Sequence, residues 1–170
     1  ELEAKTLQEY GVDSLSQLPV SFAAISLQAS ENRDWVIFDK NYGALFDTFQ
    51  RQNRFMDAFN ALSPMLAMRN LSRALAGTDV DKHVDFTRHA EGFRRMMQQT
   101  LNGEMKTKAA GKDYDYTADE TLWKKIPPFS YRPPGVGAVL KNQWLNLSVL
   151  FGWTVGIWVL LGWTAGRLRP

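Results

Sequence analysis

No charged residue interrupts the stretch Asn142-Gln-Trp-Leu-Asn-Leu-Ser-Val-Leu-Phe-Gly-Trp-Thr-Val-Gly-Ile-Trp-Val-Leu-Leu-Gly-Trp-Thr-Ala-Gly166, which is 25 residues long. A helix rises about 1.5 Å per residue, so about 20 apolar residues cross a hydrocarbon core about 30 Å thick. Trp144 and Trp163 lie near its two ends, and indole rings favour the headgroup level of a bilayer. The alternative is a buried core helix, but core helices rarely run this long without a charge. The stretch therefore predicts a transmembrane helix over residues 142–166.

The rest of the chain has the composition of a water-soluble domain. Its charges are well mixed, and the net charge of the whole chain is +2, which gives no electrostatic footprint for nucleic acid. There is no cysteine, which excludes disulfides and thiolate chemistry. We predict a helical domain over residues 1–133, a hinge over 134–141, the membrane helix over 142–166 and a cytoplasmic tail over 167–170. Because the chain starts in a helix-forming run without a signal segment, we expect it to be a piece of a longer polypeptide.

Helical spacing recurs throughout this domain, so the predicted fold class is all-α. A first helix is expected to end at Gly11 and a short apolar one to cover Phe22 to Ala29. A long amphipathic helix is expected next, and its apolar positions recur in steps of three and four. We name these positions the seam: Trp35, Phe38, Tyr42, Leu45, Phe49, Gln52, Met56 and Phe59. Such a seam is typical of a packed core; a ligand groove is the alternative.

Capping residues predict where the next helices begin and end. Ser63 and Pro64 suit the start of a helix that ends at Gly77. Thr78 or Asp79 is expected to cap a further helix that runs to about Met105, although Gly103 could end it early. Residues 106–112 are polar and contain Gly and Ala, so we expect a mobile linker there. Thr117 and Glu120 match a capping box for a short helix after the linker.

Four prolines in the eight residues 127–134 predict an extended, polyproline-like segment. We call these residues the proline segment and expect it to act as a rigid strut between domain and membrane. Aromatic side chains, including that of Trp123, would hold the strut against the domain or the headgroup layer. A plain linker that only spaces two helices is the alternative. The candidate strut residues are Pro127, Pro128, Phe129, Tyr131, Pro133 and Pro134.

Few residues suggest chemistry. Asp113, Asp115, Thr117 and Asp119 alternate like the first half of a calcium-binding loop, but Ala118 and Lys124 occupy positions that need Gly and Glu. His83 and His89 fall on different sides of a helix, so they cannot hold one metal together. No nucleotide-binding loop, catalytic serine motif or zinc-protease motif occurs. We therefore expect no catalytic residue, no metal, no cofactor and no enzymatic activity.

Two further patterns concern partners. The membrane helix contains two pairs of glycines, each pair spaced four residues apart, which could let another helix approach closely. These helix-packing candidates are Gly152 with Gly156 and Gly162 with Gly166. Asn70-Leu-Ser72 and Asn146-Leu-Ser148 match the glycosylation pattern, which has no meaning in a bacterial protein.

Three runs of sequence resemble a known family. They are Val36-Ile-Phe-Asp-Lys-Asn-Tyr-Gly-Ala-Leu-Phe-Asp47, Leu62-Ser-Pro-Met-Leu-Ala-Met-Arg-Asn-Leu-Ser-Arg-Ala-Leu-Ala-Gly-Thr-Asp79 and Asp113-Tyr-Asp-Tyr-Thr-Ala-Asp-Glu-Thr-Leu-Trp-Lys-Lys-Ile-Pro-Pro-Phe-Ser-Tyr-Arg-Pro-Pro134. Together they resemble the bacterial ABC-2-type transporter permeases that carry a domain of unknown function, the DUF3526-type permeases. Such permeases have several membrane spans and a coupling helix, whereas this chain shows one span.

The resemblance implies an extracytoplasmic helical domain and the last membrane helix of an ABC exporter permease in the bacterial inner membrane. Its implied partners are a cytoplasmic ATPase subunit, a second permease copy or a paralogue, and membrane lipid, with no nucleic acid. Four basic residues flank the span on its domain side and two lie in the tail: Lys124, Lys125, Arg132 and Lys141 against Arg167 and Arg169. This count alone would favour a cytoplasmic domain, yet long folded domains translocate largely regardless of such charge. The competing hypothesis is a membrane-anchored helical binding module without a transport role.

Overall fold

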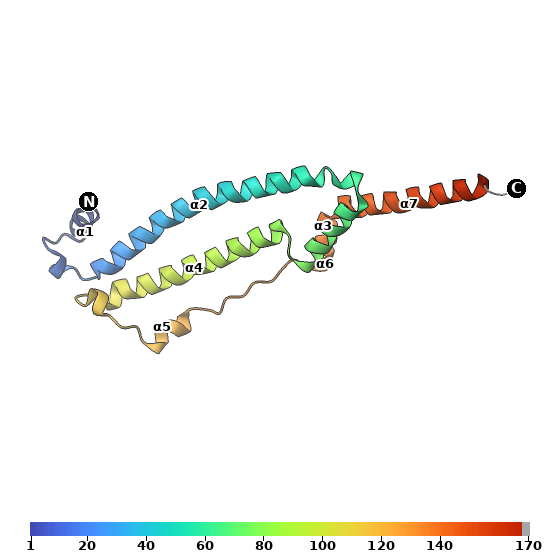
Figure 1. Cartoon of the computed structure of the whole chain (residues 1–170). Helices are drawn as coiled ribbons and strands as arrows, with labels where there is room; N and C mark the ends of the chain where they lie inside the picture. The colour runs from blue at the N-terminus through green and yellow to red at the C-terminus, as the bar shows by residue number, and fades with distance from the viewer. Residues whose placement is uncertain (168–170) are drawn as a thin grey trace. The chain divides into compact units, whose positions relative to one another are not determined.

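The computed structural model describes residues 1–167 of the chain, so all but the first residue of the predicted tail at 167–170 lies outside the described residues. Over the described part the chain forms helices and no strand, which confirms the all-α fold class (Figure 1). The contacts divide it into two compact units. Unit 1 comprises residues Glu1–Gly43 and Arg88–Ser130, and unit 2 comprises Ala44–Thr87 and the chain from Tyr131 onward.

The α-helices follow the chain in the order α1 (Leu2–Tyr10), α2 (Phe22–Asp57), α3 (Pro64–Ala76), α4 (Val80–Lys108), α5 (Glu120–Lys125), α6 (Val136–Asn142) and α7 (Trp144–Arg167). Short 3-10 turns lie between them at Leu15–Gln17, Asn60–Leu62 and Asp113–Asp115. The prediction that a short helix over Phe22 to Ala29 is separate from the seam helix is wrong, because α2 runs unbroken through residues 30–34. That stretch contains neither Gly nor Pro, so nothing there ends the helix.

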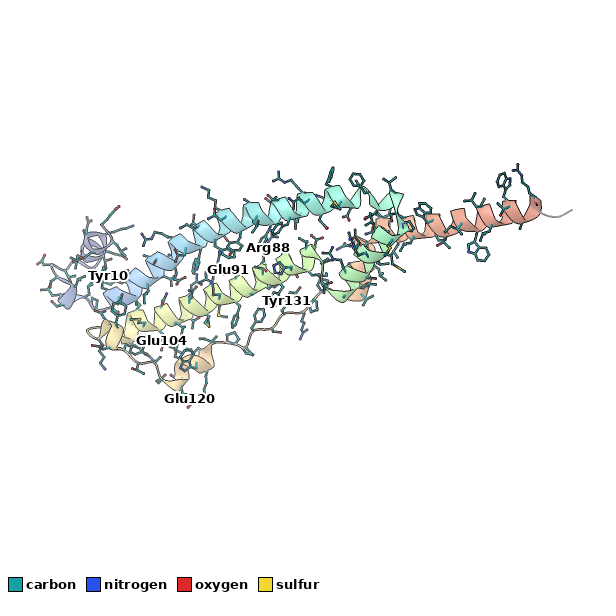
Figure 2. The ribbon with its side chains drawn as sticks, viewed as in Figure 1. Tyr10, Arg88, Glu91, Glu104, Glu120 and Tyr131 are labelled. Carbon is teal, nitrogen blue, oxygen red and sulfur yellow. The ribbon has the colours of Figure 1, made fainter. Side chains whose placement is uncertain are left out.

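Side chains of α2 and α4 meet through ion pairs in unit 1. The Arg94 guanidinium lies 3.3 Å from the Glu31 carboxylate, and Arg95 donates to both Asp39 oxygens at 2.6 and 3.0 Å. Both arginines also bond Glu91, which lies on the side of α4 that faces α2 (Figure 2). The hydrogen bond from Arg94 is the main cause that lowers the pKa of Glu91, and that from Arg95 lowers the pKa of Asp39. The α2–α4 contact is therefore strongly polar.

The seam is packed at its start. The Arg95 guanidinium lies over the rings of Trp35 and Phe38, 5.5 and 5.7 Å from their centres, and both aromatic side chains are half-buried. Phe38 also stacks on Tyr42, with ring centres 4.3 Å apart.

Beyond this point the core prediction for the seam is wrong. Its later members are exposed: Tyr42, Leu45, Phe49, Met56 and Phe59. The buried ring is Phe46, which is 4% exposed, whereas Phe49 is 38% exposed. A seam with a repeat of about 3.5 residues drifts round a straight helix of 3.6 residues per turn by about 20° per heptad. Positions next to the seam therefore turn inward along the second half of α2.

The linker predicted at residues 106–112 is also wrong as a mobile segment. Helix α4 continues to Lys108, and Ala109 is fully buried. The Ser21 N–H donates to the Lys106 carbonyl at 2.9 Å, and the Ser21 hydroxyl donates to Asp113 at 2.7 Å. These bonds fasten the end of α4 to the start of α2, and no local sequence pattern could have indicated a contact over so many residues.

Helix ends agree better with the predictions. Gly77 ends α3 with a φ of 70°, a left-handed conformation that costs glycine little. Asp79 then accepts a hydrogen bond from the Lys82 N–H at 2.8 Å and caps α4, and Gly103 does not interrupt this helix. One cap differs: Asp119, rather than Thr117, accepts from the first N–H groups of α5.

Because Phe46 is buried in place of the predicted Phe49, the two residues should differ in their contribution to stability. Phe46→Ala should lower the free energy of unfolding by about 3–5 kcal/mol, since it empties a buried aromatic site. Phe49→Ala should cost about 1 kcal/mol or less, because its ring remains in contact with solvent. Thermal unfolding of the chain in lipid nanodiscs measures both, and equal losses would contradict the assignment of Phe46 to the core.

Candidate functional site

Helix α7 is long and apolar enough to span a membrane, judged by its length and composition. Its bounds, Trp144–Arg167, nearly match the span predicted at 142–166. Gln143 leaves helical geometry, with φ −97° and ψ 17°, and so separates α7 from α6, which occupies most of the predicted hinge at 134–141. At the other end the Arg167 guanidinium lies 3.8 Å from the centre of the Trp163 ring.

A network of amide and carboxylate side chains joins the first turn of α7 to the helical part of unit 2. Asn60, in a 3-10 turn, donates to Asn146 of α7 at 2.7 Å and to Asp57 of α2 at 3.1 Å. Asn70 of α3 donates to Asp57 at 2.9 Å, and Asn146 donates to Gln143 at 2.5 Å. We call these five residues the junction network. Helix α3 lies beside α6 and the start of α7 in this unit (Figure 1).

Because two of its amides are buried, the junction network allows only one arrangement of α7 against the 3-10 turn. Asn60 is 2% exposed and Asn146 is 5% exposed, so water cannot replace a lost partner at either amide. A buried polar group without a partner costs about 1–3 kcal/mol, and α7 therefore has one favoured rotation and position against the 3-10 turn. The network holds α7 in a fixed register against the 3-10 turn Asn60–Leu62 and the neighbouring ends of α2 and α3.

An open cavity of about 570 Å³ lies beside the network, lined among others by Asp57, Asp81, Lys141 and Asn146. Burial, followed by the charges of Asp79 and Asp57, raises the pKa of Asp81. Within residues 1–167 no group of three or more His, Cys, Asp or Glu side chains is placed to hold a metal ion.

The proline segment is extended, as predicted, and each unit holds its own part of it against α4. In unit 1 the Phe129 ring lies 5.3 Å from that of Phe93. In unit 2 the Tyr131 ring meets Phe86 edge-on at 5.3 Å, and its hydroxyl donates to Asp85 at 2.8 Å. Tyr131 is labelled in Figure 2. This hydrogen bond is the main cause that raises the pKa of Tyr131.

The other candidate strut residues make fewer contacts. The four prolines are exposed: Pro127, Pro128, Pro133 and Pro134. Trp123 is exposed as well. The segment therefore has two aromatic anchors, Phe129 and Tyr131, between constrained prolines. Its role as a strut stays a prediction.

The glycine positions of α7 lie on an exposed helix. Gly152 and Gly156 line a shallow groove of about 360 Å³ together with Trp153 and Ile157. Gly162 and Gly166 lie farther along α7 and are exposed. A Cβ atom added at any of the four would meet nothing within 4 Å. The surface is open to another helix, and its use for packing stays a prediction.

The asparagines of the junction network carry a role that no sequence pattern predicted. Asn70 and Asn146 stood out as glycosylation matches, although both side chains bond inside unit 2. The available signal was the position of Asn146, an amide inside an otherwise apolar run. A polar side chain at such a place needs a partner, and the partner could not be named without the fold.

The comparison with known families adds one finding. A family model described as a domain of unknown function, DUF3526, matches residues 1–132. The chain belongs to the DUF3526 family. The family match ends within the proline segment, so the DUF3526 domain covers α1 to α5 and stops before α6 and α7. No curated protein and no solved structure matches the chain.

The junction network of this DUF3526 protein can be tested at Asn146. Asn146→Ala should lower the free energy of unfolding by about 1–3 kcal/mol, because the buried Asn60 amide nitrogen loses its acceptor on α7 and keeps only its bond to Asp57. Asn142→Ala, at the exposed last position of α6, is the matched control and should be nearly neutral. Thermal unfolding in nanodiscs measures both changes; equal effects would contradict the role of the network.

Proposed function

We propose that the chain is the external helical domain and one membrane helix of the permease of an ABC-type exporter. In this proposal the domain lies outside the cytoplasm of a bacterial cell, and α7 crosses the inner membrane. A separate cytoplasmic ATPase hydrolyses the nucleotide, and a second permease copy or a paralogue completes the path. The chain itself carries out no enzymatic step. The domain shapes the export path or docks a partner.

The observation that carries this proposal is the junction network. A domain that only needed tethering to a bilayer could hang from a flexible linker. Here the first turn of α7 is bonded to the 3-10 turn through the side chains of Asn60 and Asn146, both buried. A shift of α7 would therefore move the 3-10 turn and the helices bonded to it. Transporters use such rigid coupling when membrane helices rearrange between states.

Two other observations support the same proposal. Membership in the DUF3526 family agrees with the resemblance of three sequence runs to ABC-2-type permeases. The proline segment fixes φ at four positions and is anchored at Phe129 and Tyr131, so it forms a second, stiff connection between domain and membrane helix.

The second candidate function is a membrane-anchored helical binding module. Exposed apolar side chains at and just after the end of α2 favour it, because Phe55, Met56 and Phe59 offer an apolar surface to a protein or peptide. In such a module the stiffness of the connection to α7 would not matter.

Replacing the prolines separates the two functions. The variant Pro127→Gly, Pro128→Ser, Pro133→Gly and Pro134→Ser keeps the length of the segment but removes its constraint. Transport-coupled ATP hydrolysis by the full permease with its ATPase should fall roughly two- to thirtyfold, as expected for the loss of coupling energies of this kind.

The matched control is Ser130→Gly, which adds a glycine to the same segment and keeps all four prolines. It should retain most of the activity. Circular dichroism and thermal unfolding establish that both variants are folded. Full activity of the proline variant would reduce the segment to a tether and favour the binding module.

The orientation of the domain can be tested with single thiols, because the chain contains no cysteine. Thr117→Cys changes an exposed side chain of similar size in the domain, and Arg167→Cys lies at the far end of α7. In spheroplasts a membrane-impermeant maleimide should label Cys at position 117 at once and at position 167 only after lysis. The reverse pattern would place the domain in the cytoplasm.

A further inference from the structure

Unit 2 contains a pocket that the proposed function does not use. Its volume is about 560 Å³, within the range of roughly 300–1,000 Å³ typical of small-molecule sites. Aromatic rings from three segments line it: Phe49 of α2, Phe86 of α4 and Tyr131 of the proline segment. The pocket thus explains why the seam leaves Phe49 partly exposed, as in the ligand-groove alternative for that seam.

The polar groups around this pocket are mostly basic. Arg73, Lys82 and His83 line it together with the carboxylate of Asp79. In the described part of the chain the side chains of these three basic residues form no hydrogen bond or ion pair. Asp79 is occupied differently, since it accepts the bond from the Lys82 N–H that caps α4. The Tyr131 hydroxyl is bonded to Asp85, so Tyr131 offers the pocket its apolar ring.

The turn between α3 and α4 gathers these charges. Gly77, with its positive φ, ends α3, and α4 starts at Val80, so the last turn of α3 and the first turn of α4 border the same pocket. Arg73 comes from the former and Lys82 from the latter. The partial positive charge at the N-terminus of the long helix α4 adds to theirs. The pocket joins an aromatic interior to a basic edge.

We propose that this pocket binds a small organic anion that has an aromatic or short alkyl body and one carboxylate or phosphate group. The apolar body lies among Phe49, Phe86 and Tyr131, and the anionic group reaches Arg73 and Lys82. A cation of the same shape meets two fixed positive charges and is rejected. The occupant also contacts Tyr131 and Pro133, so its binding directly involves the proline segment.

Three probes with the same phenylbutyl skeleton test the charge requirement: 4-phenylbutyrate, its neutral amide and 4-phenylbutylamine. Isothermal titration of the full chain in neutral-lipid nanodiscs gives the affinities, and the carboxylate should bind at least about fivefold more tightly than the amide. The amine should show no binding above empty nanodiscs. Octanoate in place of 4-phenylbutyrate reports whether an alkyl body is also accepted.

Variants locate the site. Arg73→Gln and Lys82→Gln should each weaken 4-phenylbutyrate binding about fivefold, the loss expected for one partly exposed charge pair. Arg69→Gln, at an exposed position one turn earlier on α3, is the matched control and should bind as the unchanged chain does. Phe49→Ala should weaken both carboxylate and amide.

Several outcomes would overturn the proposal. They are the absence of carboxylate binding by the unchanged chain, equal binding of carboxylate and amine, or equal loss in Arg69→Gln and Arg73→Gln. The readout is binding, so it is independent of transport and of the proposed permease function. Circular dichroism confirms that each variant is folded before its affinity is compared.

Discussion

The structure depends on a hydrogen bond between two buried amides, Asn60 and Asn146, 2.7 Å apart. One belongs to a 3-10 turn of the helical domain, and the other belongs to a helix apolar enough to cross a membrane. Apolar side chains of α7 cannot fix its position against the domain, since hydrophobic contact is non-directional. The amide pair supplies the direction and selects one register.

The two units are stabilised by different means. In unit 1 the contact of α2 with α4 relies on carboxylates and guanidinium groups around Glu91, with Trp35 and Phe38 under Arg95. In unit 2 the buried positions include Phe46, Asn60 and Asn146 of the junction network, and the small residues of α3 that let other helices approach. Helices α2 and α4 contribute to both units, so each changes the character of its buried face along its length.

Local features could be predicted from the sequence, and contacts over long separations could not. The membrane-length helix depends on one continuous run of sequence, and the stop at Gly77 and the cap at Asp79 each depend on residues within one or two helix turns. The bond between Asn60 and Asn146 joins residues 86 positions apart, and no periodicity indicates it. The core prediction for the seam was wrong for a related reason. A repeat of 3.5 residues predicts which face of a helix is apolar, but the partner helix and the straightness of α2 decide which residues near that face are buried. Of the candidate site, the aromatic anchors of the proline segment were foreseen and the asparagines were not.

The ion pairs between α2 and α4 make unit 1 sensitive to its ionic surroundings. Mobile ions screen charges over about 8 Å at physiological ionic strength and over about 3 Å at 1 M. The pairs from Arg94 to Glu31 and from Arg95 to Asp39 are partly exposed, so concentrated salt weakens them. Apolar burial does not weaken in this way, and excluded salts such as sulfate strengthen it. Salt therefore loosens the helix pair of unit 1 while the apolar packing around Phe46 in unit 2 persists, so the ionic strength of the medium acts on the two units differently.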